Sequence, residues 1–310
     1  MDIRERIKKV GVVGCGTMGS GITQVCAQFG YKTIVSETNE DLLKKGIGSI
    51  ESFLNKGIER GKITQQEKES TLANIKGVND LKYFSDCDLI IEAVSEDLNL
   101  KKRIFADLDR ICPEHTILGT NTSNLCIMEI ASATKRQEKV LGLHFMNPVP
   151  LMKLVEVVRS IATSEDTLEL GKEFTKSLGK DYIVASDNPG FIVNRLNSPF
   201  LLNAIRMFET GIGSIEDIDK AATLALNHPM GPFTLMDFAG LDMMYNSVQQ
   251  RYEELPIPEF MPSPLLKRMV HAGRFGRKTG KGWYEYNEKG EKVGAMKLEK
   301  VSKSLGKEQK

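Results

Sequence analysis

The chain has 310 residues, enough for about two domains of roughly 100–200 residues each. Hydrophobic residues make up 41% and charged residues 27%, as in ordinary globular proteins, and the formal net charge of +1 provides no basic field for nucleic acid. No stretch approaches the ~20 consecutive apolar residues that a membrane span needs, so we expect neither a nucleic-acid partner nor a membrane.

The cysteine content and the N-terminus point to a reduced compartment. The residues before the first strand pattern are too few and too charged for a signal peptide. The five cysteines are odd in number, widely spaced and without a C-x-x-C pair, so neither a disulfide framework nor a zinc site is indicated. We therefore expect a cytoplasmic protein without a metal site.

A strand–turn–helix–strand unit opens the chain. The apolar run at residues 10–13 predicts a buried parallel strand, and a glycine-rich stretch follows at residues 14–19. A helix is predicted over residues 20–29 and ends at Gly30. The next strand is predicted at residues 33–35.

Strands and helices continue to alternate after this unit. Residues 39–74 are charged and helical, and we interpret them as a helical hairpin inserted into the sheet domain. Helices are expected at residues 101–110 and 165–178, and further strands at residues 89–92, 116–118, 140–144, 154–158 and 182–185. This alternation predicts an α/β fold, a Rossmann-type doubly wound and mostly parallel sheet.

Helical periodicity replaces the strand signals after Asp187-Asn188-Pro189-Gly190. Helices are predicted at residues 191–209 and 215–226. We therefore predict a Rossmann domain over residues 1–187 and a smaller all-helical domain over residues 188–310. Lysine, glutamate and glycine dominate after Tyr286, which predicts a flexible tail from about residue 287.

Three glycines and one acid form a dinucleotide-binding pattern. Gly14 allows a tight turn, Gly16 lets the backbone approach a pyrophosphate, and Gly19 permits close helix–strand packing. Glu37 ends the second predicted strand, 18 residues beyond Gly19, where a carboxylate accepts hydrogen bonds from the adenosine ribose. A carboxylate there repels a 2′-phosphate, so NAD is favoured over NADP. FAD is the alternative that shares this pattern.

His144 is the candidate acid–base residue among the four histidines. It ends an apolar strand at the carboxyl edge of the sheet, where open α/β folds bind ligands. An imidazole with a pKa near 6.5 can take an alcohol proton while hydride leaves the same carbon. Glu156, inside an apolar strand pattern, is a candidate orienting partner, although an edge-strand charge explains it equally well. We interpret His115, His228 and His271 as surface or structural.

Seven longer motifs extend these observations. They are GCGTMGSGI at residues 14–22, NTS at 121–123, HFMNPVP at 144–150, MKLVEV at 152–157, PGFIVNR at 189–195, HPMGP at 228–232 and GRKTGKGWY at 276–284. Together they closely resemble the short-chain L-3-hydroxyacyl-CoA dehydrogenases, and most of all the bacterial 3-hydroxybutyryl-CoA dehydrogenases. The resemblance covers nearly everything from Lys9 to Tyr286.

The resemblance implies an activity and a set of partners. A chain of this family oxidises (S)-3-hydroxyacyl-CoA, here 3-hydroxybutyryl-CoA, to the 3-ketoacyl-CoA, here acetoacetyl-CoA, with NAD, or catalyses the reverse reduction. Hydride transfer then depends on the His144–Glu156 pair. The acyl-CoA is the expected substrate, and a homodimer formed through the helical domain is the expected assembly.

The resemblance also assigns further site residues. It adds Ser123 and Asn194 to the catalytic pair, and both would also bind the substrate, together with Lys56 near the CoA moiety. The residues implied to contact the cofactor are Gly14, Gly16, Thr17, Met18, Gly19, Glu37, Glu96, Lys101, Ser123 and Asn147.

The chain departs from the family pattern in three places. Glu37 stands where the family usually has aspartate, Trp283 stands where it commonly has phenylalanine, and some 24 residues follow Tyr286 beyond the usual family end. Two alternative functions stay open. One is a dehydrogenase of a free 3-hydroxy acid such as L-gulonate, and the other is a non-catalytic relative of the kind found among lens crystallins.

Overall fold

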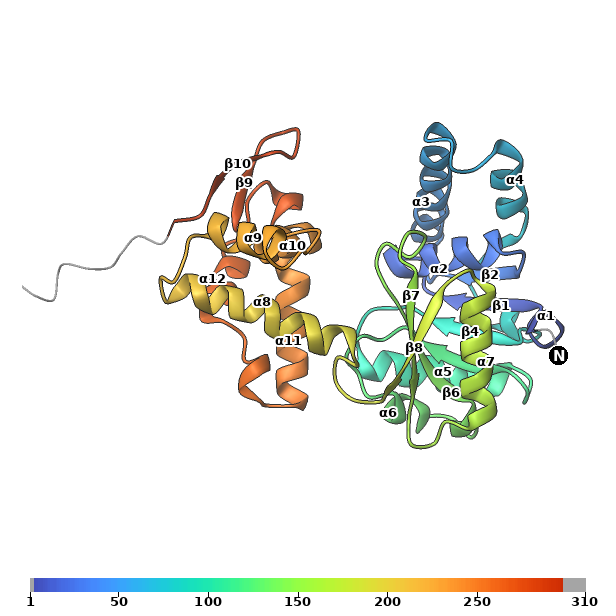
Figure 1. Ribbon diagram of the computed structural model, residues 1–310. Helices are drawn as coiled ribbons and strands as arrows, with labels where there is room; N and C mark the ends of the chain where they lie inside the picture. The colour runs from blue at the N-terminus through green and yellow to red at the C-terminus, as the bar shows by residue number, and fades with distance from the viewer. Residues whose placement is uncertain (1–2, 298–310) are drawn as a thin grey trace, which may run out of the picture. The chain divides into compact units, whose positions relative to one another are not determined.

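The computed structural model describes residues 3–297, and the chain divides into two compact units, Met1–Ile192 and Val193–Lys310 (Figure 1). Hydrophobic clusters lie on both faces of the sheet in the first unit, and a separate cluster fills the second. Each unit therefore has a core of its own.

The first unit is built on an eight-stranded sheet with the order β3-β2-β1-β4-β5-β6-β7-β8. Neighbouring strands are parallel except β6 and β7, which are antiparallel. The strands are β1 (Lys9–Val13), β2 (Lys32–Ser36), β3 (Ile75–Val78), β4 (Leu89–Glu92), β5 (Ile117–Thr120), β6 (Val140–Phe145), β7 (Leu154–Arg159) and β8 (Asp181–Ser186). The sequence did not predict β3, because its four residues form no apolar run and two of them are exposed.

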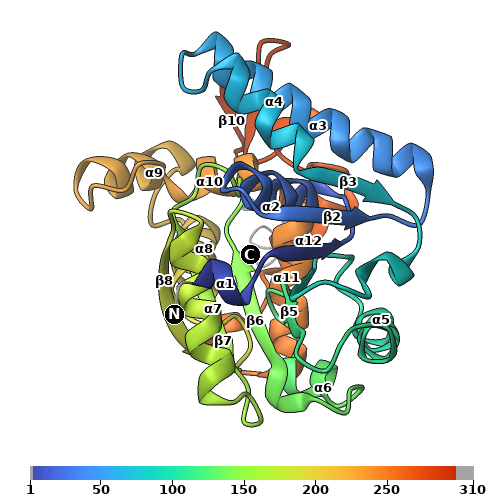
Figure 2. The ribbon, with the colours of Figure 1, turned by 90° about the vertical axis from the view of Figure 1, so that its right-hand side faces the viewer.

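Helices cover both faces of this sheet (Figures 1 and 2). α2 (Thr17–Gln28) and α7 (Glu165–Ser177) pack on one face, and α5 (Leu98–Ile111) and α6 (Ile127–Ala131) pack on the other. Burial on both faces explains why strands such as β6, with all six residues buried, are continuous apolar runs in the sequence. The predicted mostly parallel, doubly wound α/β fold is confirmed.

The strand order reverses between β1 and β4. The chain leaves β1 through α2 to β2 on one side, and it leaves β4 through α5 to β5 on the other. Open α/β sheets bind ligands at the carboxyl ends of the strands where such a reversal occurs. Gly14 follows β1 and Glu92 ends β4, so both residues lie at this point.

The inserted helical hairpin predicted from residues 39–74 is present as α3 (Glu40–Glu59) and α4 (Gln65–Ala73). Asn39 begins α3 by accepting hydrogen bonds from two backbone N–H groups of the first turn. Thr64 and Glu67 form a reciprocal capping box at the start of α4. Both helix starts are therefore determined by local sequence.

The second unit is mainly helical, and the prediction that it is all-helical needs correction, because residues 284–286 and 292–295 form a two-stranded sheet. Its fully buried Trp283 packs edge-to-face against Phe208 and Phe233. Among the described residues the indole N–H of Trp283 has no hydrogen-bond partner, so the phenylalanine that the family resemblance implies here would lose no hydrogen bond. The helices of this second unit are α8 (Val193–Glu209), α9 (Ile215–Leu224), α10 (Pro232–Ala239), α11 (Leu241–Glu254) and α12 (Pro264–His271). The first unit begins with a short helix of its own, α1 (Ile3–Arg6).

The predicted flexible tail needs correction over residues 287–297. A turn closed by hydrogen bonds between Asn287 and Glu291 leads into β10 (Lys292–Ala295), which pairs antiparallel with β9 (Tyr284–Tyr286). The strand was missed because its pairing partner, and not an apolar run, determines it. The rest of the predicted tail, residues 298–310, lies outside the described residues.

Asp237 joins this small sheet to α10. Its carboxylate accepts hydrogen bonds from Trp283 N (2.8 Å), Tyr284 N (2.8 Å) and the hydroxyl of Tyr286 (3.0 Å). A Cβ on Gly282 would lie 2.0 Å from the Asp237 carboxylate, so only glycine fits there. Burial raises the pKa of Asp237, and the three donors oppose that rise.

Several chemical features can be assessed across the described residues. No helix within residues 3–297 is long and apolar enough to cross a membrane, and no described cluster of His, Cys, Asp or Glu could hold a metal ion. All five cysteines are free thiols. Burial raises the pKa of Cys15 to about 11 and that of Cys26 to about 12, so neither is a thiolate near neutral pH.

Two glycines of the motif after β1, Gly16 at the N-cap of α2 and Gly19 within α2, should respond differently to alanine. A Cβ on Gly19 would lie 1.9 Å from the backbone oxygen of Gly14, whereas a Cβ on Gly16 would meet no atom within 4 Å. We expect Gly19→Ala to lower the free energy of unfolding by about 1–3 kcal/mol or more, as overpacking does. Gly16→Ala should fold normally but bind NADH at least ~10-fold more weakly, because the methyl group takes space that a pyrophosphate needs.

Thermal unfolding and titration of NADH fluorescence would measure the two effects separately. Wild-type stability in Gly19→Ala would contradict the close contact between the turn and α2. Wild-type NADH affinity in Gly16→Ala would contradict a pyrophosphate at this turn.

Candidate active site

Glycine shapes the turn between β1 and α2. Gly14 has a φ of 94°, in the left-handed region, and its N–H donates to Ser36 O (2.9 Å). Gly16 is the N-cap residue of α2, and no side chain caps the helix. The N–H groups of the first turn are therefore free of side-chain partners and, with the open space above Gly16, they fit the pyrophosphate of a dinucleotide.

Glu37 follows β2 beside this turn. One of its carboxylate oxygens accepts a hydrogen bond from Cys15 N (3.0 Å), and the other accepts one from Thr38 N (2.8 Å). The adjoining pocket, of about 410 Å³, is lined by Gly14, Glu37 and residues after β4 and on α5. The structure thus places the acid predicted to contact the ribose in a pocket at the strand-order reversal.

A second pocket, of about 380 Å³, lies between the glycine-rich turn, α3 and the loop after β6. Thr17 and the exposed Asn147 are among its lining residues, and on α3 the lining extends to Phe53. Met18, by contrast, packs against the hydrophobic cluster on the α2 side of the sheet. Of the cofactor residues implied by the family resemblance, Thr17 and Asn147 therefore line the pocket, whereas Met18 packs against the core.

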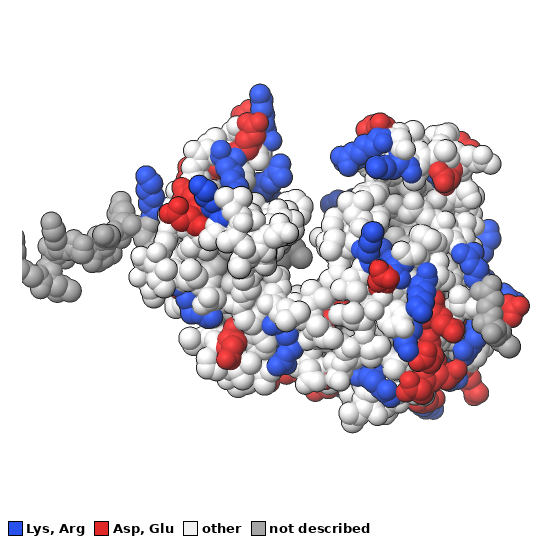
Figure 3. All heavy atoms as spheres, viewed as in Figure 1, with Lys and Arg blue, Asp and Glu red and all other residues white. Residues whose placement is uncertain are grey.

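Lys56 lies on α3, one turn beyond Phe53, and is exposed. Basic side chains gather at the free end of the α3–α4 hairpin on the face shown in Figure 3. Exposed residues there include Arg60 and Lys62. This end of the hairpin therefore favours anionic groups such as phosphates.

Ser123, His144 and Glu156 form a continuous hydrogen-bonded chain. His144 Nδ1 lies 2.6 Å from a carboxylate oxygen of Glu156, and His144 Nε2 lies 3.0 Å from Ser123 Oγ. With Glu156 as the acceptor, Nδ1 carries the proton, so Nε2 can accept one from a hydroxyl group. The arrangement has the logic of a catalytic triad in which an acid orients an imidazole.

Strand pairing produces the His–Glu contact. In the antiparallel ladder of β6 and β7, His144 is directly opposite Glu156, so the two side chains lie on the same face of the sheet. The Glu156 side chain is 0% exposed and that of His144 is 7% exposed. The other carboxylate oxygen of Glu156 accepts a hydrogen bond from Ile192 N (2.9 Å), which supplies a second donor to the buried charge.

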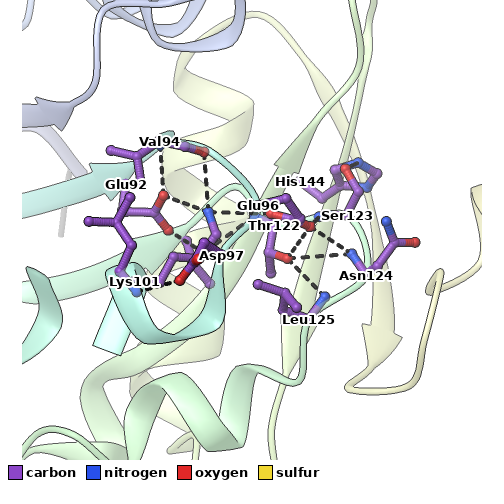
Figure 4. Close-up of polar contacts among 12 residues, drawn as sticks. Glu92, Val94, Glu96, Asp97, Lys101, Thr122, Ser123, Asn124, Leu125 and His144 are labelled. Atoms are coloured by element: carbon purple, nitrogen blue, oxygen red, sulfur yellow. Dashed lines mark hydrogen bonds and ion pairs between the residues drawn. The ribbon is translucent and has the colours of Figure 1, made fainter. Parts of the chain in front are cut away.

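Glu96 organises the turn that carries Ser123. One of its carboxylate oxygens accepts hydrogen bonds from Thr122 Oγ1 (2.6 Å), Ser123 N (2.8 Å) and Asn124 N (3.1 Å). Figure 4 shows Glu96 between this turn and the ammonium group of Lys101. Glu96, predicted as a cofactor contact, therefore also determines the conformation around Ser123.

Lys101 lies within the protein and not at its surface. Its side chain is 1% exposed, and its ammonium group lies 2.6 Å from Glu92 and 3.4 Å from Glu96. Glu92, which ends the apolar run Leu89-Ile90-Ile91-Glu92, is not among the site residues predicted from the sequence. A carboxylate in an apolar strand pattern was the signal that identified Glu156, and the same signal applies to Glu92.

The other residues of interest lie elsewhere. His115 is exposed and contacts Asp88 (3.2 Å) at the amino edge of the sheet, opposite the site. His228 lies in the second unit and stacks on Phe200 with ring centroids 4.7 Å apart. Asn194 is the second residue of α8, also in the second unit.

The chain is similar to known proteins over most of its length. Residues 9–188 match the model of the 3-hydroxyacyl-CoA dehydrogenase NAD binding domain, and residues 190–286 match that of the 3-hydroxyacyl-CoA dehydrogenase C-terminal domain. The chain is 45% identical over 284 residues to a 3-hydroxybutyryl-CoA dehydrogenase of Mycobacterium tuberculosis, an alignment that covers 91% of this chain and 99% of the relative. It is 43% identical over 288 residues to the mitochondrial hydroxyacyl-coenzyme A dehydrogenase of Sus scrofa, covering 90% and 91%.

A solved structure agrees with these matches. The crystal structure of M. tuberculosis FadB2 is similar with a TM-score of 0.89 at 45% identity, covering 91% of this chain and 99% of that one. The family models together extend from residue 9 to residue 286, and the two relatives each cover nine-tenths of the chain. The chain therefore belongs to the 3-hydroxyacyl-CoA dehydrogenase family, and its first unit contains that family's NAD-binding domain.

Proposed function

We propose that this chain is a 3-hydroxybutyryl-CoA dehydrogenase, which interconverts (S)-3-hydroxybutyryl-CoA and acetoacetyl-CoA with NAD. The observation that carries the proposal is the Ser123–His144–Glu156 chain at the carboxyl edge of the sheet, the edge that also carries the glycine-rich turn. The bacterial relative with 45% identity has this name, which supports the short acyl chain.

His144 is the proposed general base. With Nδ1–H held by Glu156, Nε2 accepts the proton of the substrate 3-hydroxyl group, and the Glu156 carboxylate stabilises the imidazolium. Bound NAD supplies the hydride acceptor, C4 of its nicotinamide ring. The O–H and C–H bonds of the alcohol break and the carbonyl double bond forms, and in the reverse direction His144 returns the proton to the carbonyl oxygen.

Ser123 and Asn194 are proposed to hold the substrate oxygen. The Ser123 hydroxyl lies 3.0 Å from His144 Nε2, so one substrate oxygen can contact both Nε2 and that hydroxyl. Fixed donors of this kind stabilise charge that develops on an oxygen in the transition state. For Asn194 the proposal rests on the family resemblance.

The anionic CoA portion of the substrate is proposed to lie along the α3–α4 hairpin. The basic side chains at its free end support this placement, and Lys56 is the proposed contact (Figure 3). Free 3-hydroxy acids such as L-gulonate lack this portion. A test that compares the CoA ester with a free acid therefore separates the two classes of dehydrogenase.

A homodimer and a cytoplasmic location complete the proposal. Large apolar side chains of the helical unit are exposed, as at subunit interfaces: Leu196 is 73%, Ile212 70% and Leu224 75% exposed. The cytoplasm stays a prediction, because the pig relative is named as a mitochondrial protein.

The activity should be visible directly from NADH absorbance. We expect rapid NADH oxidation with acetoacetyl-CoA, and little or none with free acetoacetate or with NADPH. His144→Gln should lower kcat by about 10²–10⁴-fold, because it removes the base, while NADH affinity stays near the wild-type value. His115→Gln is the matched control, since His115 lies at the opposite edge of the sheet and should be dispensable.

Three results would contradict parts of this proposal. Turnover of the free acid but not of the CoA ester would favour the free-acid dehydrogenase. Bound NADH without any turnover would favour a non-catalytic relative. Wild-type kcat in His144→Gln would show that another group takes the proton.

Cofactor preference should depend on Glu37. Its carboxylate faces the pocket after β2, where it repels a 2′-phosphate and accepts from ribose hydroxyls. We expect Glu37→Ser to reduce the ratio of kcat/KM for NADH over NADPH by at least ~10-fold, mainly through weaker use of NADH. An unchanged ratio would show that another residue sets the preference. Thermal unfolding of the variant would control for loss of the hydrogen bond to Cys15 N.

The dimer should be measurable by light scattering after size-exclusion chromatography. We expect a mass about twice the 34.5 kDa of the chain. Leu224→Asp, which places a charge in the exposed apolar surface of α9, should shift the mass toward the monomer. A monomeric wild-type protein at micromolar concentration would contradict the homodimer.

A further inference from the structure

Glu92 lies in the sheet beneath the candidate site and has no role in the mechanism described so far. Its side chain is 0% exposed at the carboxyl end of β4, where the strand order reverses. Oε1 accepts hydrogen bonds from Lys101 Nζ (2.6 Å) and Val94 N (2.7 Å), and Oε2 accepts one from Thr120 Oγ1 (2.7 Å). Both oxygens of this carboxylate thus accept hydrogen bonds from within the protein.

Lys101 is shared between two carboxylates. Its ammonium group lies 2.6 Å from Glu92 and 3.4 Å from Glu96, so Glu92 is the nearer partner and determines where the ammonium group sits. Burying an ion pair costs desolvation free energy that well-packed apolar side chains would avoid, so a buried pair is weak evidence for stability. The Glu92–Lys101 pair can instead be explained by a role in positioning other residues of the site.

The contacts continue from Glu96 to the catalytic chain. Glu96 holds the N–H groups of Ser123 and Asn124, and Ser123 contacts His144 (Figure 4). Each step is a direct polar contact of 3.4 Å or less. This series of contacts begins in the sheet at Glu92 and ends at the imidazole ring of His144.

We propose that Glu92 is a positioning residue which, through Lys101 and Glu96, fixes the turn that presents Ser123 to His144 and to the substrate. The inference rests on the proposed function. Without the charge of Glu92, Glu96 is the only carboxylate partner left to the Lys101 ammonium group within residues 3–297, and the ammonium group moves toward it. Glu96 is then drawn away from the N–H groups of Ser123 and Asn124, and the turn loosens.

The first experiment compares Glu92→Gln with a matched control. Asp109 lies on α5 eight residues after Lys101, ~12 Å farther along the helix. Like Glu92, Asp109 accepts hydrogen bonds from a cation and from a backbone N–H, here Arg136 Nε (2.7 Å) and Lys135 N (3.0 Å). The side chains of Asp109 and Arg136 are each about one-tenth exposed. Glu92→Gln and Asp109→Asn should both lower the Tm.

Of the two variants, only Glu92→Gln should lower kcat with acetoacetyl-CoA, by roughly 10-fold. KM should change less than about 2-fold, because misplaced catalytic groups affect chemistry more than binding. In a Ser123→Ala background, the same substitution should lower kcat by less than about 2-fold, because residues acting through one path are not additive. Equal kcat in Glu92→Gln and Asp109→Asn, or an undiminished loss in the Ser123→Ala background, would overturn the proposal.

Amide hydrogen exchange of residues 121–125 provides a readout that needs no turnover. It should be faster in Glu92→Gln than in wild type or Asp109→Asn, and equal exchange would overturn the proposal. A wild-type protein inactive on acetoacetyl-CoA would reject the proposed function, while the exchange result would still decide whether Glu92 holds the turn. If Glu92→Gln does not fold, Thr120→Val is the second variant, because it removes one hydrogen-bond donor to Glu92. It should lower kcat roughly 3-fold and make the amide exchange of residues 121–125 faster. Wild-type kcat together with wild-type exchange in Thr120→Val would overturn the proposal.

Discussion

The antiparallel pairing of β6 with β7 sets His144 directly opposite Glu156, and the chemistry proposed for the site depends on the hydrogen bond that results. The other neighbouring strands of the sheet are parallel, so this reversal is the local exception in an otherwise regular arrangement. It brings a carboxylate and an imidazole onto one face within the core, where solvent does not weaken their attraction. The remaining nitrogen of the imidazole then faces Ser123 and whatever hydroxyl group the site receives.

Carboxylates recur at this edge of the sheet: Glu92 and Glu156 are buried, whereas the side chain of Glu96 is 26% exposed. Each is held by donors from more than one element, and for Glu96 these are the turn after β5 and Lys101 on α5. Glu156 has His144 and a backbone N–H close to the boundary with the second unit. Glu92 has a lysine, a threonine and a backbone N–H, and Glu96 has three donors from the turn after β5. Because an unpaired buried charge is costly, Glu92 and Glu156 fix the segments that supply their donors. The same groups that carry charge in the site therefore also determine its geometry.

The two units of the chain contain different features. The first unit contains the glycine-rich turn, Glu37, which is predicted to contact the ribose, and the hydrogen-bonded Ser123–His144–Glu156 chain, all on one sheet. The second has its own apolar core, in which Asp237 joins a helix to the small β9–β10 sheet. Asp237 explains two glycines of the motif at residues 276–284, since a Cβ on Gly282 would lie 2.0 Å from its carboxylate and a Cβ on Gly276 would lie 2.4 Å from its backbone oxygen.

Local sequence determined the elements with strong periodicity or clear end signals: seven strands of the large sheet, the inserted hairpin with its caps, and the turn after β1. It also identified His144 and Glu156, since a polar residue in or at the end of an apolar strand is visible in one dimension. Only the tertiary structure decided the rest. β3 and β10 exist because of their pairing partners, so their own residues contain little signal. The contacts of Lys101 with Glu92 and of Glu96 with Ser123 join residues from different strands, helices and turns, and such contacts form only when the sheet brings those elements together.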